Sequence, residues 1–279
     1  MDAEAITIDG LFFGRTRCLE TTYVFVYTGV EMLTVRSYTL SIAAPAYNEA
    51  DGLEKTIAEW QAYLREADFI SEYEIVICND GSLDQTGAIL DRLARHDSHV
   101  RVLHLEKNQG AAEALSKAIA ATRLDWVLLM DADGQFPVTY LAPMIKKVEE
   151  GATATIGIRR KKEDSLFTRF GSKASGMLCN LFFGTKYADF NSVFKLVPGN
   201  VLRSLVLEAK GLNSSTELTA KLLERGIDMA ELSVIHQPRM HGKSSVRPLR
   251  DALHRLLFVL YIGNRQLLFK LRVLQRPSR

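Results

Sequence analysis

The stretch WVLLMDADGQFP, residues 126–137, decides the fold class and points to the chemistry. A short apolar run bounded by Gly and Pro is typical of a strand buried in a sheet. Asp131 and Asp133 follow this run with one residue between them, and residues i and i+2 of an extended segment project the same way. In open α/β sheets, ligands gather beyond the carboxyl ends of the strands. The sequence therefore predicts a binding site at this edge.

Two carboxylates that address one point suit a hard divalent cation. Mg²⁺ takes one or two protein carboxylates and completes its shell with water and substrate phosphates. On a diphosphate, such a cation neutralises the charge of a leaving phosphate. The structural alternative is a solvated turn at a strand end. An EF-hand is excluded because Gln135 stands at the third ligand position and Ala142 at the twelfth, and a haloacid-dehalogenase-like loop would need Thr or Val at 135.

Short β-rich runs alternate with helical patterns on both sides of this stretch. Expected strands lie at 38–45, 73–78, 100–105 and 125–130, with apolar residues at helical spacing between them. Such alternation predicts an α/β fold with a mostly parallel central sheet flanked by helices. Further strands are expected at 152–160 and 229–238, a helix at about 214–225, and helices again from 247 onward.

We expect three regions in the chain. Residues 1–37 form an N-terminal extension that is an added strand, a disordered tail, or sequence upstream of a true start at Met32. Residues 38–245 form the α/β domain, and residues 246–279 form a basic amphipathic tail. In this tail, five leucines fall on one helical face: Leu249, Leu253, Leu256, Leu257 and Leu260.

Composition narrows the class of protein. The chain has 279 residues, of which 47% are hydrophobic and 24% charged, as in ordinary globular proteins. Three scattered cysteines without a CxxC pair indicate neither a disulfide framework nor a zinc site, so we expect a reducing, cytoplasmic setting. The longest apolar run of the C-terminal region, LLFVLYIG at 256–263, is too short to cross a bilayer. Ten Lys and Arg against one acid give residues 239–279 a charge of +9, which predicts an anionic partner.

Polar, turn-prone loops follow the three expected strands that precede residue 126. They are APAYNEADG at 44–52, CNDGSLDQTG at 78–87 and EKNQGAAEALSKAI at 106–119. A capping box of Ser82 with Gln85 and a helix opening at Gly110 are structural alternatives for two of them, but all three loops fall on the edge that carries Asp131 and Asp133. No GxGxxG follows a strand, and GKSS at 242–245 lacks the earlier Gly of a P-loop because Gln237 stands there.

In this order and at these intervals, PAYNE, NDGS, KNQGAAEALSKAI and MDADGQFP resemble glycosyltransferase family 2, which has the GT-A fold. Within it, the likeness is to dolichol-phosphate mannose synthase and bacterial polyprenyl-phosphate hexosyltransferases. The resemblance covers about residues 38–245. IGIRR, ADFNSVFKL and PRMHGKSS resemble further segments that contact phosphate, acceptor and donor.

The resemblance implies roles for particular residues. Asp80 would accept the N–H of the nucleotide base, and Arg159 and Arg239 would bind phosphate. The implied metal ligands for Mg²⁺ or Mn²⁺ are Asp131, Asp133 and Gln135. The implied donor-binding set is Pro45, Tyr47, Glu49, Cys78, Asp80, Asp131, Ala132, Asp133, Arg159 and Arg239. The candidate catalytic residues are Asp133, Asp189, Arg159, Arg239 and Glu217.

Three positions depart from the family pattern. Asn79 replaces the first Asp of DDGS, Val193 replaces a Gly, and Ser245 stands where a phosphate-pairing Lys is common. Lys243 or Arg247 are the available substitutes for that Lys.

The resemblance implies inverting transfer of a sugar from a UDP- or GDP-sugar to a polyprenyl phosphate. Such an acceptor needs no general base, because a phosphate with a second pKa near ~6 is already anionic at neutral pH. A hydroxyl acceptor would need a carboxylate within hydrogen-bond reach, and Glu217 or Asp189 are the candidates. The capping-box spacing of Ser214 and Glu217 favours a structural role for Glu217.

Two alternatives stay open. One is transfer to a polysaccharide or another hydroxyl acceptor, and the other is a non-catalytic nucleotide-sugar-binding protein. We expect peripheral attachment of the tail to the inner face of the cytoplasmic membrane, with packing on the domain or a second subunit as alternatives. A homo-oligomer or a membrane subunit is compatible with the sequence. Nucleic-acid binding is disfavoured because the basic tail lacks aromatic stacking motifs.

Overall fold

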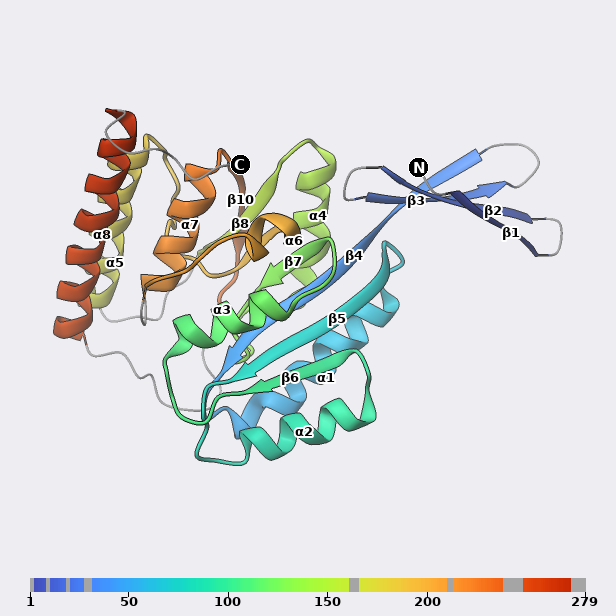
Figure 1. Cartoon of the computed structure of the whole chain (residues 1–279), viewed down its shortest axis with the longest axis horizontal. Coiled ribbons are helices and arrows are strands. Elements are labelled where there is room, and N and C mark those ends of the chain that lie inside the picture. The colour runs from blue at the N-terminus through green and yellow to red at the C-terminus, as the bar shows by residue number, and fades with distance from the viewer. Residues whose placement is uncertain are drawn as a thin grey trace.

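The computed structural model describes residues 3–8, 11–18, 21–27, 32–160, 166–209, 213–237 and 248–271. Side chains are described for residues 36–160, 173–209, 213–237, 254–268 and 271. Figure 1 shows a mixed α/β body, with an antiparallel group of strands at the N-terminus that projects to one side.

The central sheet has the strand order β6–β5–β4–β7–β9–β8–β10. These strands span β4 Met32–Ala46, β5 Ile70–Asn79, β6 Val100–His104, β7 Trp126–Leu129, β8 Ala154–Arg159, β9 Lys195–Pro198 and β10 Met229–Val234. Neighbouring strands run parallel except at β9, which is antiparallel to both β7 and β8. The predicted mostly parallel sheet is therefore confirmed.

Helices cover both faces of this sheet. Their bounds are α1 Ala50–Glu66, α2 Thr86–His96, α3 Ala111–Ala121, α4 Leu141–Glu149, α5 Leu166–Phe183, α6 Gly199–Arg203, α7 Ser214–Glu224 and α8 Pro248–Lys270, with a 3-10 turn, η1, at Val138–Tyr140. Alternate strand residues face opposite layers, as the two-residue period of a strand requires. Ile42 and Ile75 pack on the α1 and α4 side, whereas Ala43 and Val76 pack on the α3 and α7 side.

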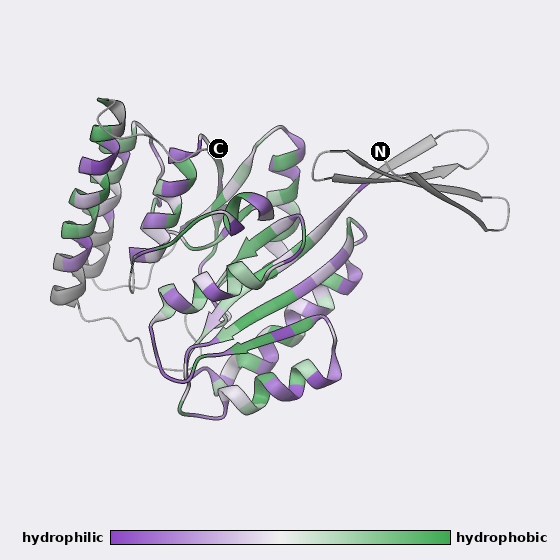
Figure 2. Cartoon of the chain, viewed as in Figure 1, coloured by the Kyte–Doolittle hydropathy of each residue, from purple (hydrophilic) through white to green (hydrophobic). Residues whose placement is uncertain are grey.

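The core consists of apolar strand residues enclosed between these two layers. Leu40, Ile42, Ile75 and Leu128 are completely buried. Figure 2 shows hydrophobic residues concentrated along the central strands, with hydrophilic residues on the outer faces of α1 and α2. Burial of continuous apolar runs on both faces is typical of parallel sheets, and it leaves the polar loops at the strand ends to form sites.

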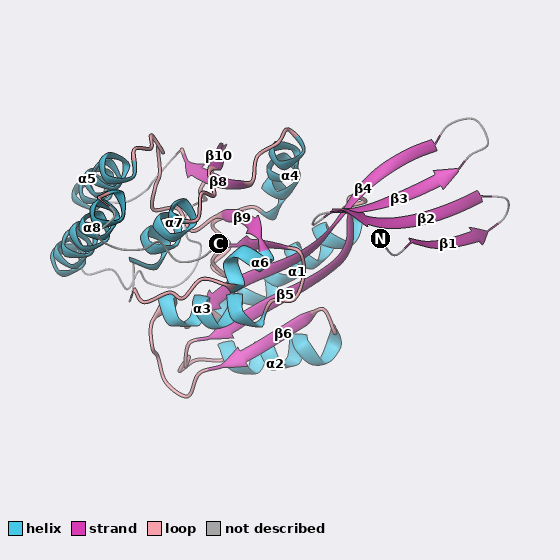
Figure 3. Ribbon diagram, turned by 45° about the horizontal axis from the view of Figure 1, so that its top comes forward, coloured by secondary structure: helices cyan, strands magenta, loops and turns pink. Residues whose placement is uncertain are grey.

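The N-terminal extension forms strands in this structure. β1 Ala3–Ile8, β2 Leu11–Cys18 and β3 Thr21–Tyr27 pair antiparallel in sequence order, and β3 pairs with the first residues of β4. β4 then continues without a break across Ser37 and Tyr38 into the centre of the body. One strand therefore belongs to both sheets, as Figure 3 shows.

Candidate active site

The carboxyl ends of β4, β5 and β7 meet at one edge of the sheet. β4 lies between the other two, and the Asp80 N–H donates to the carbonyl of Ala46 at 2.9 Å. On the other side of β4, the Met130 N–H donates to the carbonyl of Ala43 at 3.3 Å. The loops that carry Tyr47, Asp80 and the Asp131–Asp133 pair thus leave adjacent strands at the same edge, as the sequence predicts.

The two acids after β7 lie on the outer side of their loop. Asp131 and Asp133 are partly exposed, whereas Ala132 between them is buried. The Asp133 carboxylate accepts the Gln135 N–H at 3.1 Å, which forms a tight turn. Gly134 has φ +73°, and a Cβ there would lie 3.0 Å from Thr56 Oγ1 of α1. The loop is therefore held against the helix that follows Tyr47, and both acids keep part of their surface exposed there.

This donor set fits a hard divalent cation. Carboxylate oxygens are the ligands that Mg²⁺ and Mn²⁺ prefer, and two of them leave coordination positions for substrate phosphates. Within the described residues, no group of three or more His, Cys, Asp or Glu side chains is arranged to hold a metal. Gln135 donates through Nε2 to the Gln237 carbonyl at 2.9 Å. Its amide oxygen therefore points away from Gln237. Its assignment as a ligand stays a prediction.

The loop after β4 is fastened to the loop after β5. Asn48 has φ +54°, its N–H donates to Ser82 Oγ at 3.0 Å, and its side-chain oxygen accepts the Leu83 N–H at 2.8 Å. The Glu49 N–H donates to Thr86 Oγ1 at 2.9 Å. These bonds fix the backbone around Tyr47, whose ring is 37% exposed beside the edge. Pro45, within β4, is partly buried next to it.

Asp80 is buried and holds a neighbouring loop. Its carboxylate accepts the N–H groups of Gln109 at 2.7 Å and Gly110 at 2.9 Å, at the start of α3. Burial raises its pKa, although these two hydrogen bonds act in the opposite direction. A Cβ on Gly81 would lie 2.4 Å from the Lys107 carbonyl carbon, so the two loops are in close contact. Both Asp80 oxygens already accept hydrogen bonds from backbone N–H groups. The role of Asp80 in base recognition stays a prediction.

Two neighbours of Asp80 face the interior. Cys78 is fully buried in the α3-side core, and burial, with a smaller effect of Asp80, raises the pKa of its thiol to about 12. Only its backbone lies near the edge. Asn79 accepts the Ser82 N–H and bonds through Nδ2 to His104 Nδ1 at 3.0 Å. Asn79, which replaces the family Asp, therefore has a structural partner in His104, to which its amide can donate.

Arg159 and Asp189, both predicted site residues, are paired with each other. Arg159 Nε donates to Asp189 Oδ2 at 2.7 Å and Nη2 donates to Oδ1 at 3.1 Å. The Asp189 side chain is only 2% exposed, against 20% for Arg159. This ion pair joins the end of β8 to the segment before β9. Both Asp189 oxygens accept hydrogen bonds from Arg159, and a general base would need one of them for the substrate proton.

Sequence reasoning did not single out Lys195, which lies beside this pair. Its side chain is completely buried, and Nζ donates to the Ser192 carbonyl. Burial lowers its pKa to about 7, a shift that Asp189 opposes and Arg159 increases. The available signal was its position in ADFNSVFKL, where the acceptor-side segment of the family ends in Arg or Lys.

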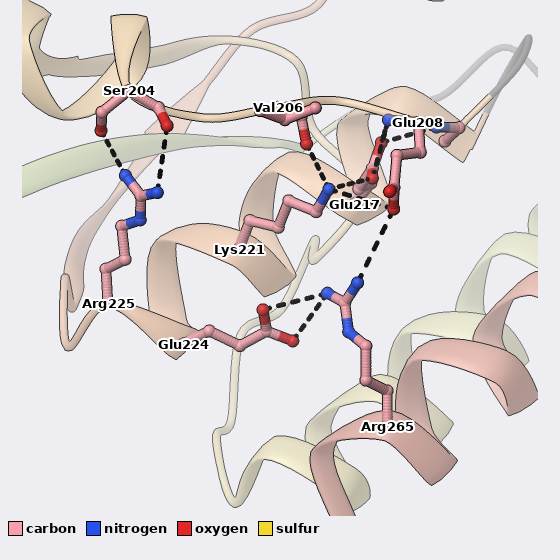
Figure 4. Close-up of polar contacts among 9 residues, drawn as sticks. Ser204, Val206, Glu208, Glu217, Lys221, Glu224, Arg225 and Arg265 are labelled. Carbon is pink, nitrogen blue, oxygen red and sulfur yellow. Dashed lines mark hydrogen bonds and ion pairs between the residues drawn. The ribbon is translucent and has the colours of Figure 1, made fainter. Parts of the chain in front are cut away.

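Glu217 holds a backbone segment. Its carboxylate accepts the N–H groups of Glu208 at 3.0 Å and Ala209 at 2.8 Å, and it pairs with Lys221 Nζ at 2.7 Å (Figure 4). The residue is 1% exposed. α7 starts after Asn213 without a side-chain cap, so a capping box is not the reason for this burial. These contacts fit a structural role for Glu217, in which its side chain holds the 208–209 segment against α7.

The segment after β10 returns to the acidic loop. The Gln237 N–H donates to the Gln135 carbonyl at 2.9 Å, and the Ile235 N–H donates to Tyr140 Oη at 3.0 Å. His236 packs edge-on against Phe136, with ring centroids 4.8 Å apart. The chain therefore leaves Gln237 beside the predicted metal ligands. Arg239, Lys243, Ser245 and Arg247 lie outside the described residues, and their predicted roles stay predictions.

Comparison with known proteins identifies the family. Residues 41–207, more than half of the chain, match the sequence model of glycosyl transferase family 2. The chain belongs to this family. It is 29% identical over 207 residues to an undecaprenyl-phosphate 4-deoxy-4-formamido-L-arabinose transferase of Shewanella sediminis (strain HAW-EB3), covering 74% of this chain and 61% of that protein. It is 27% identical to the glycosyltransferase AglD of Haloferax volcanii, covering 79% of this chain and 36% of that protein.

The chain thus spans about three fifths of the length of the undecaprenyl-phosphate transferases it resembles in sequence. Among solved structures, it is similar to glucosyl-3-phosphoglycerate synthase from Mycobacterium tuberculosis in complex with Mn²⁺, UDP-glucose and phosphoglyceric acid. The TM-score is 0.61 at 22% identity, covering 81% of this chain and 80% of that one. This likeness confirms the GT-A fold.

Proposed function

We propose that this family 2 glycosyltransferase transfers a sugar from a UDP- or GDP-sugar to a polyprenyl phosphate, with inversion at the anomeric carbon. The observation that carries the proposal is the partly exposed pair Asp131 and Asp133 in the loop after β7, at the same sheet edge as the exposed Tyr47 loop. The relatives named as undecaprenyl-phosphate transferases support the choice of acceptor.

Asp131 and Asp133 are the residues that would hold Mg²⁺ or Mn²⁺. The cation supplies Lewis-acid chemistry, which offsets the charge that develops on the leaving diphosphate. The Asn48 N–H donates to the Ser82 hydroxyl and the Asn48 side-chain oxygen accepts the Leu83 N–H, and these bonds keep the Tyr47 loop in place, so the nucleotide meets a preformed surface. Preorganised groups of this kind need little rearrangement when the substrate reacts.

The acceptor provides its own nucleophile in this reaction. A phosphate oxygen forms the new bond to the anomeric carbon as the bond to the diphosphate breaks, and no proton has to be removed at neutral pH. The two candidate bases fit this scheme because each is already engaged. Asp189 accepts two hydrogen bonds from Arg159, and Glu217 accepts backbone bonds from Glu208 and Ala209.

The reaction takes place at a membrane lipid, so we propose peripheral attachment to the inner face of the cytoplasmic membrane. Within the described part of the chain, no helix has the length and apolar character needed to cross a bilayer. The strongly basic residues 239–279 support attachment to an anionic surface.

The test is transfer of radiolabel from UDP- or GDP-sugars to undecaprenyl phosphate in detergent micelles with Mg²⁺ or Mn²⁺. We expect label in the organic phase, and at least ~10²-fold less with Asp133→Asn. Asp68→Asn, at an exposed position on the opposite end of the sheet, is the matched control and should retain full activity. Label confined to a water-soluble polymer would favour a hydroxyl acceptor. Nucleotide-sugar binding without any turnover would favour a binding protein.

A further inference from the structure

The outer side of α8 is apolar. Among the side chains described in this helix and at Leu271, the exposed large ones are Leu256, Leu257, Leu260, Tyr261, Leu267, Leu268 and Leu271. They expose between 37% and 63% of their surface. The exposed polar residues among them are His254 and Asn264, and neither is a permanent charge. A helix that faces water normally shows the reverse pattern, with charged residues outside.

Two polar side chains of this helix, Arg265 and Gln266, turn inward instead. Arg265 donates to both oxygens of Glu224 at 2.8 and 2.9 Å, and it lies 3.8 Å from Glu208 (Figure 4). Its side chain is 17% exposed and that of Glu224 only 4%. Gln266 is also buried. The interaction of Glu224 with Arg265 joins α7 to α8 and fixes the rotation of α8 about its axis.

Close packing on α5 fixes the same orientation. α5 and α8 run side by side, as Figures 1 and 3 both show. Val259 and Ile262 are buried, and a Cβ at Gly263 would lie 2.3 Å from the Phe182 ring of α5. Rotation of α8 to hide its leucines would therefore break an ion pair and produce a steric clash.

α5 adds to the exposed apolar surface. Met177 and Leu181, one turn apart, are 64% and 74% exposed. Their spacing puts them on the side of α5 away from the buried Cys179. We call these two residues and the seven exposed apolar residues of α8 the outer face of the α5–α8 pair.

We propose that this outer face lies in the interfacial region of an anionic lipid bilayer. The helix of 23 residues extends over roughly 35 Å and would lie in the plane of the membrane. The sequence beside the apolar stripe is basic at both ends: residues 239–255 hold five Lys or Arg against Asp251, and residues 270–279 hold four without an acid. Cations at the ends of an apolar stripe match anionic headgroups around an acyl region.

A second copy of the chain is a poorer occupant for this face. Face-to-face pairing would bring two tails together, each with a charge of +9 over residues 239–279. Like charges at this density repel, whereas an anionic bilayer attracts them. The inference relies on the proposed function only in expecting the acceptor to be a membrane lipid.

Flotation of the full chain with vesicles tests the proposal without either substrate. Vesicles of phosphatidylcholine with about 30% phosphatidylglycerol should bind the wild type, and higher salt should weaken the binding. The double variant Leu257→Glu/Leu268→Glu should bind at least about tenfold more weakly, because two apolar anchors are lost and two anions added. Met177→Glu/Leu181→Glu tests α5 in the same way.

Leu83→Glu is the matched control, since Leu83 is 88% exposed but lies in the loop after β5. It should bind vesicles like the wild type. Gel filtration and thermal unfolding check that each variant is folded. The proposal is overturned when the wild type stays unbound, when both double variants float normally, or when Leu257→Glu/Leu268→Glu converts a wild-type dimer into a monomer. Because no donor or polyprenyl phosphate is present, absence of transfer activity would not affect this result.

Discussion

Arg159 donates two hydrogen bonds to Asp189, and this carboxylate raises the pKa of the buried Lys195, which burial and Arg159 lower. One buried carboxylate therefore interacts with two basic side chains. Removing the charge of a buried, paired group leaves its partners uncompensated, and that costs more free energy than the pair itself contributes.

We expect Asp189→Asn to lower the free energy of unfolding by about 2–3 kcal/mol. This expected loss is smaller than the loss for a fully buried ion pair, because Arg159 is partly exposed. Urea unfolding measures the change. Lys195→Met in the Asp189→Asn background should recover part of the loss, since one unbalanced cation is removed. A change below about 0.5 kcal/mol for Asp189→Asn would contradict the arrangement.

Lys195 should make stability depend on pH. Its pKa is about 7 in the folded chain and ~10.4 when unfolded. Below pH 7, Lys195 is protonated in both the folded and the unfolded chain, and the free energy of unfolding is lowered by the full cost of burying its charge. Between these values the unfolded state binds more protons, so the free energy of unfolding rises with pH.

The test compares urea unfolding of the wild type and Lys195→Met at pH 7, 8 and 9. We expect Lys195→Met to be the more stable protein at pH 7, and the difference to shrink as the pH rises. Other alkaline titrations are common to both proteins and cancel in the difference. A difference that stays constant over this range would show that Lys195 keeps its proton.

Glu217 should prove structural. Glu217→Gln removes one of two oxygen acceptors for the N–H groups of Glu208 and Ala209, and we expect a loss of about 1–3 kcal/mol in unfolding free energy. Turnover by the folded enzyme should stay within about threefold of the wild type, whereas loss of a general base lowers the rate ~10²–10⁴-fold. Lys221→Met removes the ionic partner of Glu217 but keeps the carboxylate, and it should behave in the same way.

The buried thiols should resist modification. Burial raises the pKa of Cys78 and of Cys179 to about 12, so neither forms much thiolate at neutral pH. In a Cys18→Ser variant, a disulfide reagent should label neither thiol in the folded enzyme and both after unfolding in urea. Rapid labelling of Cys78 that a nucleotide prevents would place its sulfur at the nucleotide surface instead.

The sequence allowed the sheet edge to be predicted, but not the contacts across it. Apolar runs with polar ends are local signals, so the strands around Ile42, Ile77 and Leu128 and the acids after β7 could be recognised. β9 was missed because a four-residue run that begins with a lysine gives no clear period and no direction. The pairing of Arg159 with Asp189 joins residues thirty positions apart, and residue type alone allowed each a different partner.

The continuity of β4 also has a consequence for shortened forms of the enzyme. A chain that starts at Met32 would keep this whole strand but lose β3, which pairs with residues 32–37. The backbone groups of those six positions would then lie unpaired on one side. Open strand edges recruit other strands, so such a truncation should aggregate more readily while the catalytic edge at the far end of β4 stays intact.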